Sequence, residues 1–458
     1  MARSREVSFQ LTAAFLSAAF AFTLLASACA GKGSSPTPQP TPVPSASPVT
    51  TTATPVAPST TKMLKADLPR ALPAGVDDAA LRAVADAETA FALDLYRQVS
   101  DAADLQGKNL FYSPLSIYLA FAMTYAGASG TTADQMADTF GFDAAQGLHP
   151  ALNLLDQRLS GNKDFQLAIA NSLWGQDGFA FRQPYLEELA RSYGAGLRLV
   201  DFVEAANREA ARLAINGWVE EQTNDRIKDL VPQGVLTELT RLVLANAIYF
   251  KADWRFSFPK GSTADRPFTL NDGTVVQVPS MHRGNTPLRY ADLTEYEAVE
   301  LPYDGTDISM LVLLPRKGKL EAVEDWLDPQ SLIGTVNGLE PRTVSVTMPK
   351  FEFTVDLALK VHLQAMGITA PFDPGQADFS GIADPAKEPL YIQDALHKAF
   401  VKVDEEGTEA AAATAIIIGT TSMPVDVVEL VIDRPFVFLI RDAATGTVLF
   451  AGRVMDPR

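Results

Sequence analysis

Apolar side chains recur at helical spacing near the start of the folded region. Along residues 81–99 they return every three or four positions, so that they fall near one face of a helix. This pattern predicts an amphipathic helix whose apolar face packs on a core, and further helices are expected at 184–193 and 207–224. The residues on the apolar face are Leu81, Val84, Ala85, Phe91, Leu95 and Val99.

A second helix is predicted to begin at Ser113. Serine is a favoured cap because its hydroxyl accepts a backbone N–H of the first turn, and Pro114 suits the first helical position. From there to Gly127 the chain is apolar on every side. A helix without a polar face is expected to be buried at the centre of the molecule.

Segments rich in β-branched and aromatic residues dominate the second half of the chain. The last two of them are separated by a turn at 444–446, which predicts a hairpin. Helices come first and strands later, without the strand–helix alternation that builds parallel sheets, and this order predicts the α+β class. The strand-like segments are 240–250, 308–315, 342–356, 428–443 and 447–455.

Residues 1–28 predict a leader that is removed from the mature chain. Arg3 and Arg5 precede an apolar run over 11–25, which is short for a membrane span. The sole cysteine, Cys29, follows “LLASA”, which resembles the end of a bacterial lipoprotein signal, although alanine stands three places before the cysteine where leucine is usual. We expect lipid attachment at Cys29, with secretion of a soluble chain as the alternative. Both predict an extracytoplasmic protein.

Residues 29–76 predict a tether. Eight prolines lie between Pro36 and Pro58, mixed with serine and threonine, and such a composition cannot bury a core and favours extended polyproline. At about 3.1 Å per residue, the proline-rich stretch from Pro36 to Pro58 could reach on the order of 70 Å. A recognition ligand is the less favoured interpretation. No further linker and no repeat follows, so residues 77–458 are predicted to form one domain.

Charge and residue counts exclude several kinds of function. A net charge of −17 argues against a nucleic-acid partner and against an anionic membrane surface, so membrane contact is expected only through the lipid at Cys29. Four scattered histidines and one cysteine leave no metal site or cofactor to expect. The motifs of hydrolases, phosphate loops and dinucleotide sites do not occur, so an enzyme is disfavoured. A catalytic triad built from distant residues stays open as an alternative.

Residues 403–426 fit neither an ordinary helix nor an ordinary loop. If 408–418 became a strand, its side chains would alternate between two faces. The even positions carry no charge, and the odd positions carry one only at Glu409. No proline occurs from 407 to 423, so each backbone N–H could join a ladder. The segment is therefore predicted to be exposed in one state and able to enter a sheet in another.

The folded region resembles the serpins, the serine protease inhibitor superfamily, over nearly its whole length. This resemblance implies three β-sheets, eight or nine helices and an exposed reactive-centre loop. It further implies a monomer that is cut by a serine protease as a substrate and then traps the enzyme. The strings that carry it come in the family's order and are “NLFYSPLSI”, “LANAIYFKADW”, “DFSGI”, “HKAFVKVDEEGTEAAA” and “RPFVFLIRDAATGTVLFAGRVMDP”.

The resemblance also implies where the loop bends and where it is cut. Counting seventeen residues from the start of the hinge puts the reactive bond between Thr421 and Ser422, with a cut after Met423 as the alternative. A small neutral threonine favours an elastase-like or subtilisin-like protease, and Met423 would favour a chymotrypsin-like one. The implied hinge residues are Glu405, Glu406, Gly407, Thr408, Glu409, Ala410, Ala411, Ala412, Ala413 and Thr414.

Two supporting clusters follow from the same resemblance. A shutter, the polar cluster beneath the strands that part, is implied at Ser113, Ser116, Asn246 and His397, although Ser113 could simply cap its helix. A breach, the region where insertion starts, is implied at Trp254 and at an ion pair of Glu405 with Lys319. The alternative for that pair is an exposed contact worth under ~1 kcal/mol.

Three functional interpretations therefore stand at this point. An inhibitor is favoured because the hinge lacks proline and bulky residues. A non-inhibitory serpin, acting as a carrier or chaperone, is the main alternative, and a surface hydrolase is the third. The segment “TTADQMADTFGFD”, which matches a region that is basic in heparin-binding serpins, is acidic here, so a polyanion cofactor is not expected.

Overall fold

The computed structural model describes residues 61–458 apart from 74, 145–146, 162–164, 385, 387–388 and 409–425. Within these residues there are nine α-helices, as the resemblance implied, and none of them is long and apolar enough to cross a membrane. The helices are α1 (Asp78–Ser100), α2 (Pro114–Tyr125), α3 (Gly130–Phe140), α4 (Leu148–Ser160), α5 (Gln183–Tyr193), α6 (Ala205–Gln222), α7 (Leu320–Trp326), α8 (Pro329–Gly338) and α9 (Leu359–Ala365).

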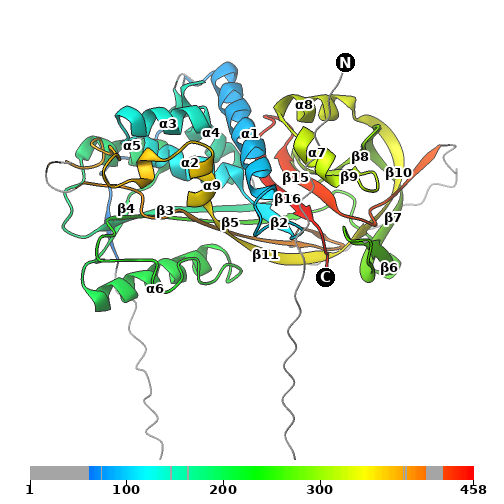
Figure 1. Cartoon of the computed structure of the whole chain (residues 1–458). Helices are drawn as coiled ribbons and strands as arrows, with labels where there is room; N and C mark the ends of the chain where they lie inside the picture. The colour runs from blue at the N-terminus through cyan, green and yellow to red at the C-terminus, as the bar shows by residue number, and fades with distance from the viewer. Residues whose placement is uncertain are drawn as a thin grey trace, which may run out of the picture. The chain divides into compact units, whose positions relative to one another are not determined.

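A seven-stranded sheet lies between the helices. Helices α1 to α5 lie on one side of it and α6 lies on the other (Figure 1). The strand order is β1-β4-β3-β5-β13-β12-β11. The strands are β1 (Lys62–Leu64), β3 (Gln166–Gln176), β4 (Leu197–Val200), β5 (Leu242–Asp253), β11 (Phe351–Ala358), β12 (Leu396–Val403) and β13 (Gly407–Thr408).

The second hydrogen-bonded system has nine strands in the order β14-β10-β7-β8-β9-β15-β16-β2, with β6 paired to β7. Three sheets were expected, but the second and third are joined here because the long strand β7 pairs with β6 at one end and with β8 at the other. The strands are β2 (Leu110–Tyr112), β6 (Ala264–Thr269), β7 (Val275–Asp292), β8 (Tyr296–Pro302), β9 (Ile308–Pro315), β10 (Glu340–Pro349), β14 (Val427–Val431), β15 (Phe436–Asp442) and β16 (Val448–Val454).

Most of the predicted elements are confirmed, and two predicted strands are divided. The segment 342–356 breaks at Lys350, where the chain passes from β10 in one sheet to β11 in the other. The segment 428–443 breaks between β14 and β15, and β15 forms the predicted hairpin with β16. Ser113 caps α2 by accepting the backbone N–H of Ser116.

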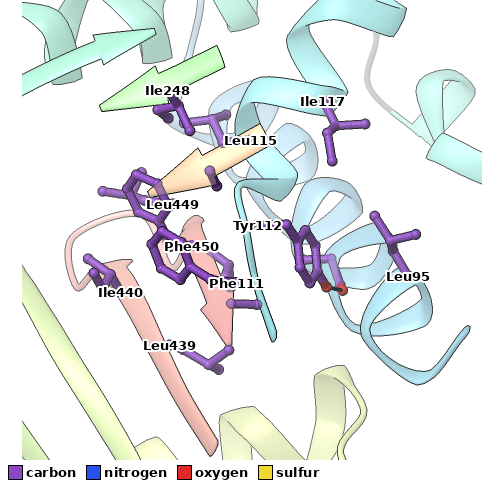
Figure 2. Packing of buried hydrophobic residues seen from close by; sticks show 14 of the residues in the cluster. Leu95, Phe111, Tyr112, Leu115, Ile117, Ile248, Leu439, Ile440, Leu449 and Phe450 are labelled. Carbon is purple, nitrogen blue, oxygen red and sulfur yellow. Dashed lines mark hydrogen bonds between the residues drawn. The ribbon is translucent and has the colours of Figure 1, made fainter. Parts of the chain in front are cut away.

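The main core surrounds α2, whose residues from Pro114 to Thr124 are all buried, as its apolar pattern predicted. Phe111 of β2 stacks on Phe450 of β16 with ring centroids 5.0 Å apart. Figure 2 shows side chains from α1, both sheets and α2 meeting here. Those labelled are Leu95, Phe111, Tyr112, Leu115, Ile117, Ile248, Leu439, Ile440, Leu449 and Phe450.

The folded domain begins earlier than the predicted boundary at residue 77. Strand β1 pairs with β4, and Ala66 is buried in the core. The prediction was wrong for residues 61–72 because this short stretch carries no periodic pattern of its own, while its partners lie more than eighty residues away in the sequence. The leader and the rest of the tether lie outside the described residues.

Glu88 on α1 supplies a prediction about stability. It is fully buried, with one carboxyl oxygen accepting the Val448 N–H at 3.0 Å and the other without a hydrogen-bond partner. Burial raises the pKa of Glu88 well above its ordinary value. The folded state thus holds a proton that the unfolded state releases above about pH 4.5, and this costs stability as the pH rises.

We therefore expect Glu88→Gln, an uncharged isostere, to raise the melting temperature of the intact protein at pH 8 and to change it little at pH 4. Thermal denaturation across this range measures the difference. A shift that is the same at both pH values would contradict the account.

Candidate functional site

The two central strands of the seven-stranded sheet meet at a junction that we call the seam. Strands β5 and β12 are parallel there, with His397 opposite Asn246 and Ala399 opposite Ile248. On their other sides β5 pairs with β3 and β12 pairs with β11, both antiparallel. A strand that entered the seam could therefore pair with both β5 and β12.

The first hinge residues already occupy one end of the seam. After β12 the chain turns, with the Asp404 N–H donating to the Gly407 carbonyl at 3.0 Å. Gly407 and Thr408 then form β13, which lies opposite Asp253 and Ala252 of β5. Thr408 also lies opposite the last residue of β12. The hinge therefore begins as a short central strand.

Close packing explains why glycine stands at position 407. A Cβ atom added there would lie 2.0 Å from the Ala252 carbonyl oxygen, which is backbone and cannot move aside. The next residue, Thr408, is 2% exposed and shares a 2.6 Å hydrogen bond with the Tyr303 hydroxyl. This short strand is therefore held in the seam by specific contacts.

Trp254, one of the predicted breach residues, lies against this turn. Its ring stacks on Tyr303 with centroids 4.5 Å apart, and its Nε1–H donates to the Asp404 carbonyl at 3.0 Å. Its backbone N–H donates to the Glu406 carbonyl at 2.8 Å. Trp254 therefore connects the buried Thr408–Tyr303 hydrogen bond to the backbone of the turn.

Glu405 is paired, but not with the predicted lysine. Its carboxylate accepts from Lys350 Nζ and from Thr263 Oγ1, each at 2.7 Å. Burial alone would raise the pKa of Glu405, but these hydrogen bonds outweigh it and hold the pKa below its ordinary value. Lys319 pairs with Glu295 at 3.1 Å instead, so the predicted Glu405–Lys319 contact was wrong.

The crossover between the sheets explains why Lys350, and not Lys319, pairs with Glu405. Lys350 stands where the chain leaves β10 for β11, and its N–H donates to the Pro279 carbonyl, beside the hinge. Lys319 instead ends a turn closed by Arg316 and opens α7. The neighbouring Glu406 also has a partner, Lys260 Nζ at 2.6 Å.

These contacts predict different effects for two lysine substitutions. Lys350→Met leaves the Glu405 carboxylate, in a residue 6% exposed, without its cation, and should destabilise the intact protein by about 1–3 kcal/mol. Lys319→Met removes an exposed pair and should change stability by less than ~0.5 kcal/mol. Denaturant unfolding of both variants measures the contrast. Equal losses would contradict the assignment of Lys350 to the hinge.

The predicted shutter residues do come together beneath the seam. His397 Nε2 accepts the Ser113 N–H at 3.1 Å, so its Nδ1 carries the proton and donates to Asn246 Oδ1. Asn246 Nδ2 donates to Ser116 Oγ at 2.8 Å and to Asn171 Oδ1 at 2.6 Å. The Asn246–His397 hydrogen bond crosses the seam and joins the two strands that would part.

Two properties of the shutter were not predicted. Asn171, on β3 directly opposite Asn246, completes the network and donates to the Ser116 carbonyl at 3.0 Å. A lone asparagine within the apolar strand “LAIANSLW” is the signal that could have identified it. In addition, burial lowers the pKa of His397 to about 3, so the ring is neutral near pH 7.

The opposite face of the seam is covered by α6 and residues 223–236, which we call the roof. A small apolar core joins the roof to Ala245 and Ala247 of β5 and to Leu396 and Phe400 of β12. Arg198 on β4 lies over the rings of Trp174 and Trp218, 5.5 and 5.1 Å from their centroids, and fastens α6 to the sheet. An inserting strand would therefore pass between the shutter and the roof.

Several predicted residues lie outside the described residues. They are the remaining hinge positions Glu409, Ala410, Ala411, Ala412, Ala413 and Thr414, the reactive-bond candidates Thr421, Ser422 and Met423, and the lipidation candidate Cys29. Over the ranges that the structure does describe, no group of three or more His, Cys, Asp or Glu side chains could hold a metal ion.

Comparison with solved structures tests the predicted fold. Among solved structures, uncleaved ovalbumin is similar, with a TM-score of 0.74 and 30% sequence identity over 82% of this chain and 100% of that chain. The α+β class and the predicted fold are thereby confirmed.

Curated relatives span animals and archaea. Antithrombin-III of Mus musculus is 38% identical over 380 residues, which are 81% of each chain. A serpin-like protein of Thermococcus kodakarensis is 40% identical over 382 residues, covering 82% of this chain and 86% of that protein. Leukocyte elastase inhibitor of Xenopus laevis is 36% identical over 378 residues, with coverage of 81% and 98%. The family model described as “Serpin (serine protease inhibitor)” matches residues 86–457, and the chain belongs to the serpin family.

Proposed function

We propose that this serpin inhibits a serine protease as a suicide substrate. The protease attacks the loop after the hinge and forms an acyl-enzyme, and the cut strand then enters the seam before the ester is hydrolysed. Relatives named antithrombin and leukocyte elastase inhibitor support inhibition in general. The observation that carries the proposal is that Gly407 and Thr408 already pair with the seam strands.

The register of these two residues sets the register of the whole strand. Thr408 pairs with Ala252 of β5 and Val403 of β12. Because the new strand is antiparallel to both, Thr414, six residues later, would pair with the residues six positions earlier, Asn246 and His397. A strand continued at this register brings Thr414 between the shutter side chains. Its hydroxyl would then replace the Asn246–His397 contact that insertion breaks.

The same register divides the side chains between the two faces. Thr408 points to the Tyr303 side, so the other even positions up to Ile418 would face that side too. The odd positions, small from Ala411 to Ala415, would face the roof and its alanines Ala245 and Ala247. Neither face buries a charge beyond Glu409, which agrees with the alternation in the sequence.

Insertion has a large driving force. The strand would add on the order of ten backbone hydrogen bonds at ~0.5–1.5 kcal/mol each, and its isoleucine and alanine surface adds ~25 cal/mol per Å² buried. A total of order 10 kcal/mol is held back in the intact chain by the closed seam. The intact protein is accordingly a kinetic trap, released by cleavage.

We assign the reactive bond to Thr421–Ser422, with Met423 as the alternative, and the target to an elastase-like or subtilisin-like protease. The inhibitor acts as a monomer outside the cytoplasm, anchored by lipid at Cys29 or secreted. The small neutral residue before the bond and the signal-like sequence before Cys29 support these assignments.

Incubation with elastase, subtilisin, chymotrypsin and trypsin tests the function directly. We expect an SDS-stable band at the summed mass with elastase or subtilisin, and mass spectrometry should map the new chain end to Ser422. Clean cleavage by every enzyme without such a band would favour the non-inhibitory carrier or chaperone. Turnover of an ester or peptide substrate by the chain alone would favour the hydrolase.

A further inference from the structure

A short segment before the first helix is folded onto the edge of the seven-stranded sheet. We call residues 61–72 the N-terminal strap, and it lies outside the region from residue 86 onward that the family model matches. Its strand β1 is antiparallel to β4, with Lys62 opposite Leu199 and Leu64 opposite Leu197. The strap therefore decides where the preceding tether joins the domain.

Contacts with two helices fasten the strap. Arg70 donates to Asn153 Oδ1 at 2.7 Å and pairs with Asp156 Oδ2 at 2.5 Å, both on α4. The Ala71 N–H donates to the carbonyl of Arg191 on α5 at 2.8 Å. The strap, which begins at Thr61, is therefore held at both the sheet and these helices.

Strand directions place that residue at the end of the sheet far from the hinge. Strand β5 ends at Asp253, opposite Gly407 of the hinge. Strand β3 is antiparallel to β5, so it ends far from the hinge, and β4 is parallel to β3. Because β1 is antiparallel to β4, it begins at that far end. In Figure 1, β4 lies toward the left and β6, which follows the hinge contact Thr263, lies toward the right.

We propose that the tether and the trapped protease share one end of this molecule. The inference rests on the proposed insertion, in which the cut strand runs along β5 from Asp253 toward Leu242 and carries the acyl-enzyme with it. That path, about 12 residues at ~3.3 Å each or ~40 Å long, ends at the end where the strap begins. The chain thus presents its loop away from the surface that holds it, and then delivers the protease toward that surface.

If the trapped protease lies at the end where the tether is attached, the tether must have a minimum length. A globular enzyme of about 200 residues is roughly 40 Å across, from its expected radius of gyration. The part of the tether from Pro36 to Pro58 alone could reach on the order of 70 Å when extended. It therefore exceeds the space that the delivered protease needs between the domain and the attachment surface, whereas a tether of a few residues would not.

Energy transfer between two dyes tests the shared end. The chain has one cysteine, so the full chain with Cys29→Ser accepts a single label at Lys62→Cys, an exposed position of the strap. A matched control carries the label at Asp265→Cys, which is exposed on β6 near the hinge contact Thr263. The protease carries the second dye, and the pair is chosen so that transfer halves at ~40 Å, the length of the sheet.

The covalent complex is compared with the non-covalent complex of a protease whose nucleophile is mutated. We expect transfer from Lys62→Cys to rise severalfold on covalent trapping and transfer from Asp265→Cys to fall. A covalent complex in which Lys62→Cys stays far from the protease overturns the shared end while leaving inhibition intact. Absence of any covalent complex overturns the proposed function and the inference with it.

A shortened tether tests the consequence. The chain is coupled through Cys29 to maleimide-bearing phosphatidylcholine vesicles, with or without a deletion of residues 33–58. We expect both chains to inhibit equally when free in solution, and only the full-length chain to form the covalent complex on vesicles. Equal inhibition by the shortened chain on vesicles would overturn the length requirement.

Discussion

Replacing Thr408 with arginine is expected to convert the inhibitor into an ordinary substrate of the same protease. Thr408 is 2% exposed and its hydroxyl bonds to Tyr303, so an arginine there would have to bury a charge or keep the hinge out of the seam. Cleavage should continue, because the proposed reactive bond follows Thr421, thirteen residues beyond Thr408 in the sequence. If the barrier to insertion rises by only ~2 kcal/mol, insertion slows about 30-fold. The acyl-enzyme would then be hydrolysed before the strand inserts.

The measurement is the number of inhibitor molecules consumed for each protease molecule inactivated, together with the SDS-stable band. Thr408→Ser keeps the hydroxyl and should leave the number consumed and the band unchanged. Thr408→Val loses the single hydrogen bond to Tyr303 and should destabilise the paired hinge by ~1 kcal/mol. An arginine variant that still forms the covalent band in full yield would show that Thr408 does not have to enter the sheet.

The sequence could predict features that depend on a repeating pattern. The uniform apolar character of α2 predicted its burial, and the cap at Ser113 follows from local chemistry. The alternation after Thr408 predicted a face without charge that a sheet could bury, and Thr408, the first of its even positions, is buried against Tyr303. In each case the information lies within a dozen consecutive residues, where one kind of periodicity dominates.

Features that depend on which distant segments meet could not be predicted in this way. Lys350 and Lys319 are both lysines near strand ends, and only the crossover between the two sheets brings Lys350 to Glu405. Asn171 becomes a shutter residue because β3 is in register with β5; the lone asparagine in an apolar strand marks the position, but nothing local names its partner. The strap was assigned to the tether for the same reason, since its partners lie on α4, α5 and β4.

In the insertion proposed above, the hinge and the shutter act at different steps. At the hinge, Gly407 and Thr408 have begun the new strand, so opening the seam need not start from a closed edge. At the shutter, the Asn246–His397 bond still joins β5 to β12 and must break before the strand can pass. On this proposal, the energy that insertion would release is retained chiefly where the seam is closed, and the protonation state of His397 should decide how firmly the seam stays closed.

Mild acid is expected to open this closure without any protease. The pKa of His397 is lowered to about 3 in the folded chain by burial, against an ordinary value of 6.5, so the opened or unfolded state binds a proton that the intact state does not. Stability is then complete above pH 6.5 and is lost as the pH falls toward 3. At 1.36 kcal/mol per pH unit, His397 alone removes about 2 kcal/mol between pH 6.5 and pH 5.

Protonation acts at a definite atom. The added proton sits on Nε2, which in the intact protein accepts the Ser113 N–H, so two donors would face each other and the strand β12 would lose its hold on α2. The inhibitor should therefore lose activity faster at pH 5 than at pH 7, and yield an uncleaved, inactive form that resists heat because its loop has entered the seam. Inhibition assays and melting curves after timed incubation at each pH follow both changes.

His397→Gln is the matched variant, because glutamine can donate to Asn246 and accept from Ser113 but cannot titrate. Burial also lowers the pKa of His149 and His362, so part of the pH dependence should persist in this variant, and the difference between the two proteins measures the share of His397. If wild type and His397→Gln lose activity with the same dependence on pH, the seam is not closed by a neutral histidine. In that case the closure of the seam must be assigned to the roof, whose apolar core joins Ala245 of β5 to Phe400 of β12.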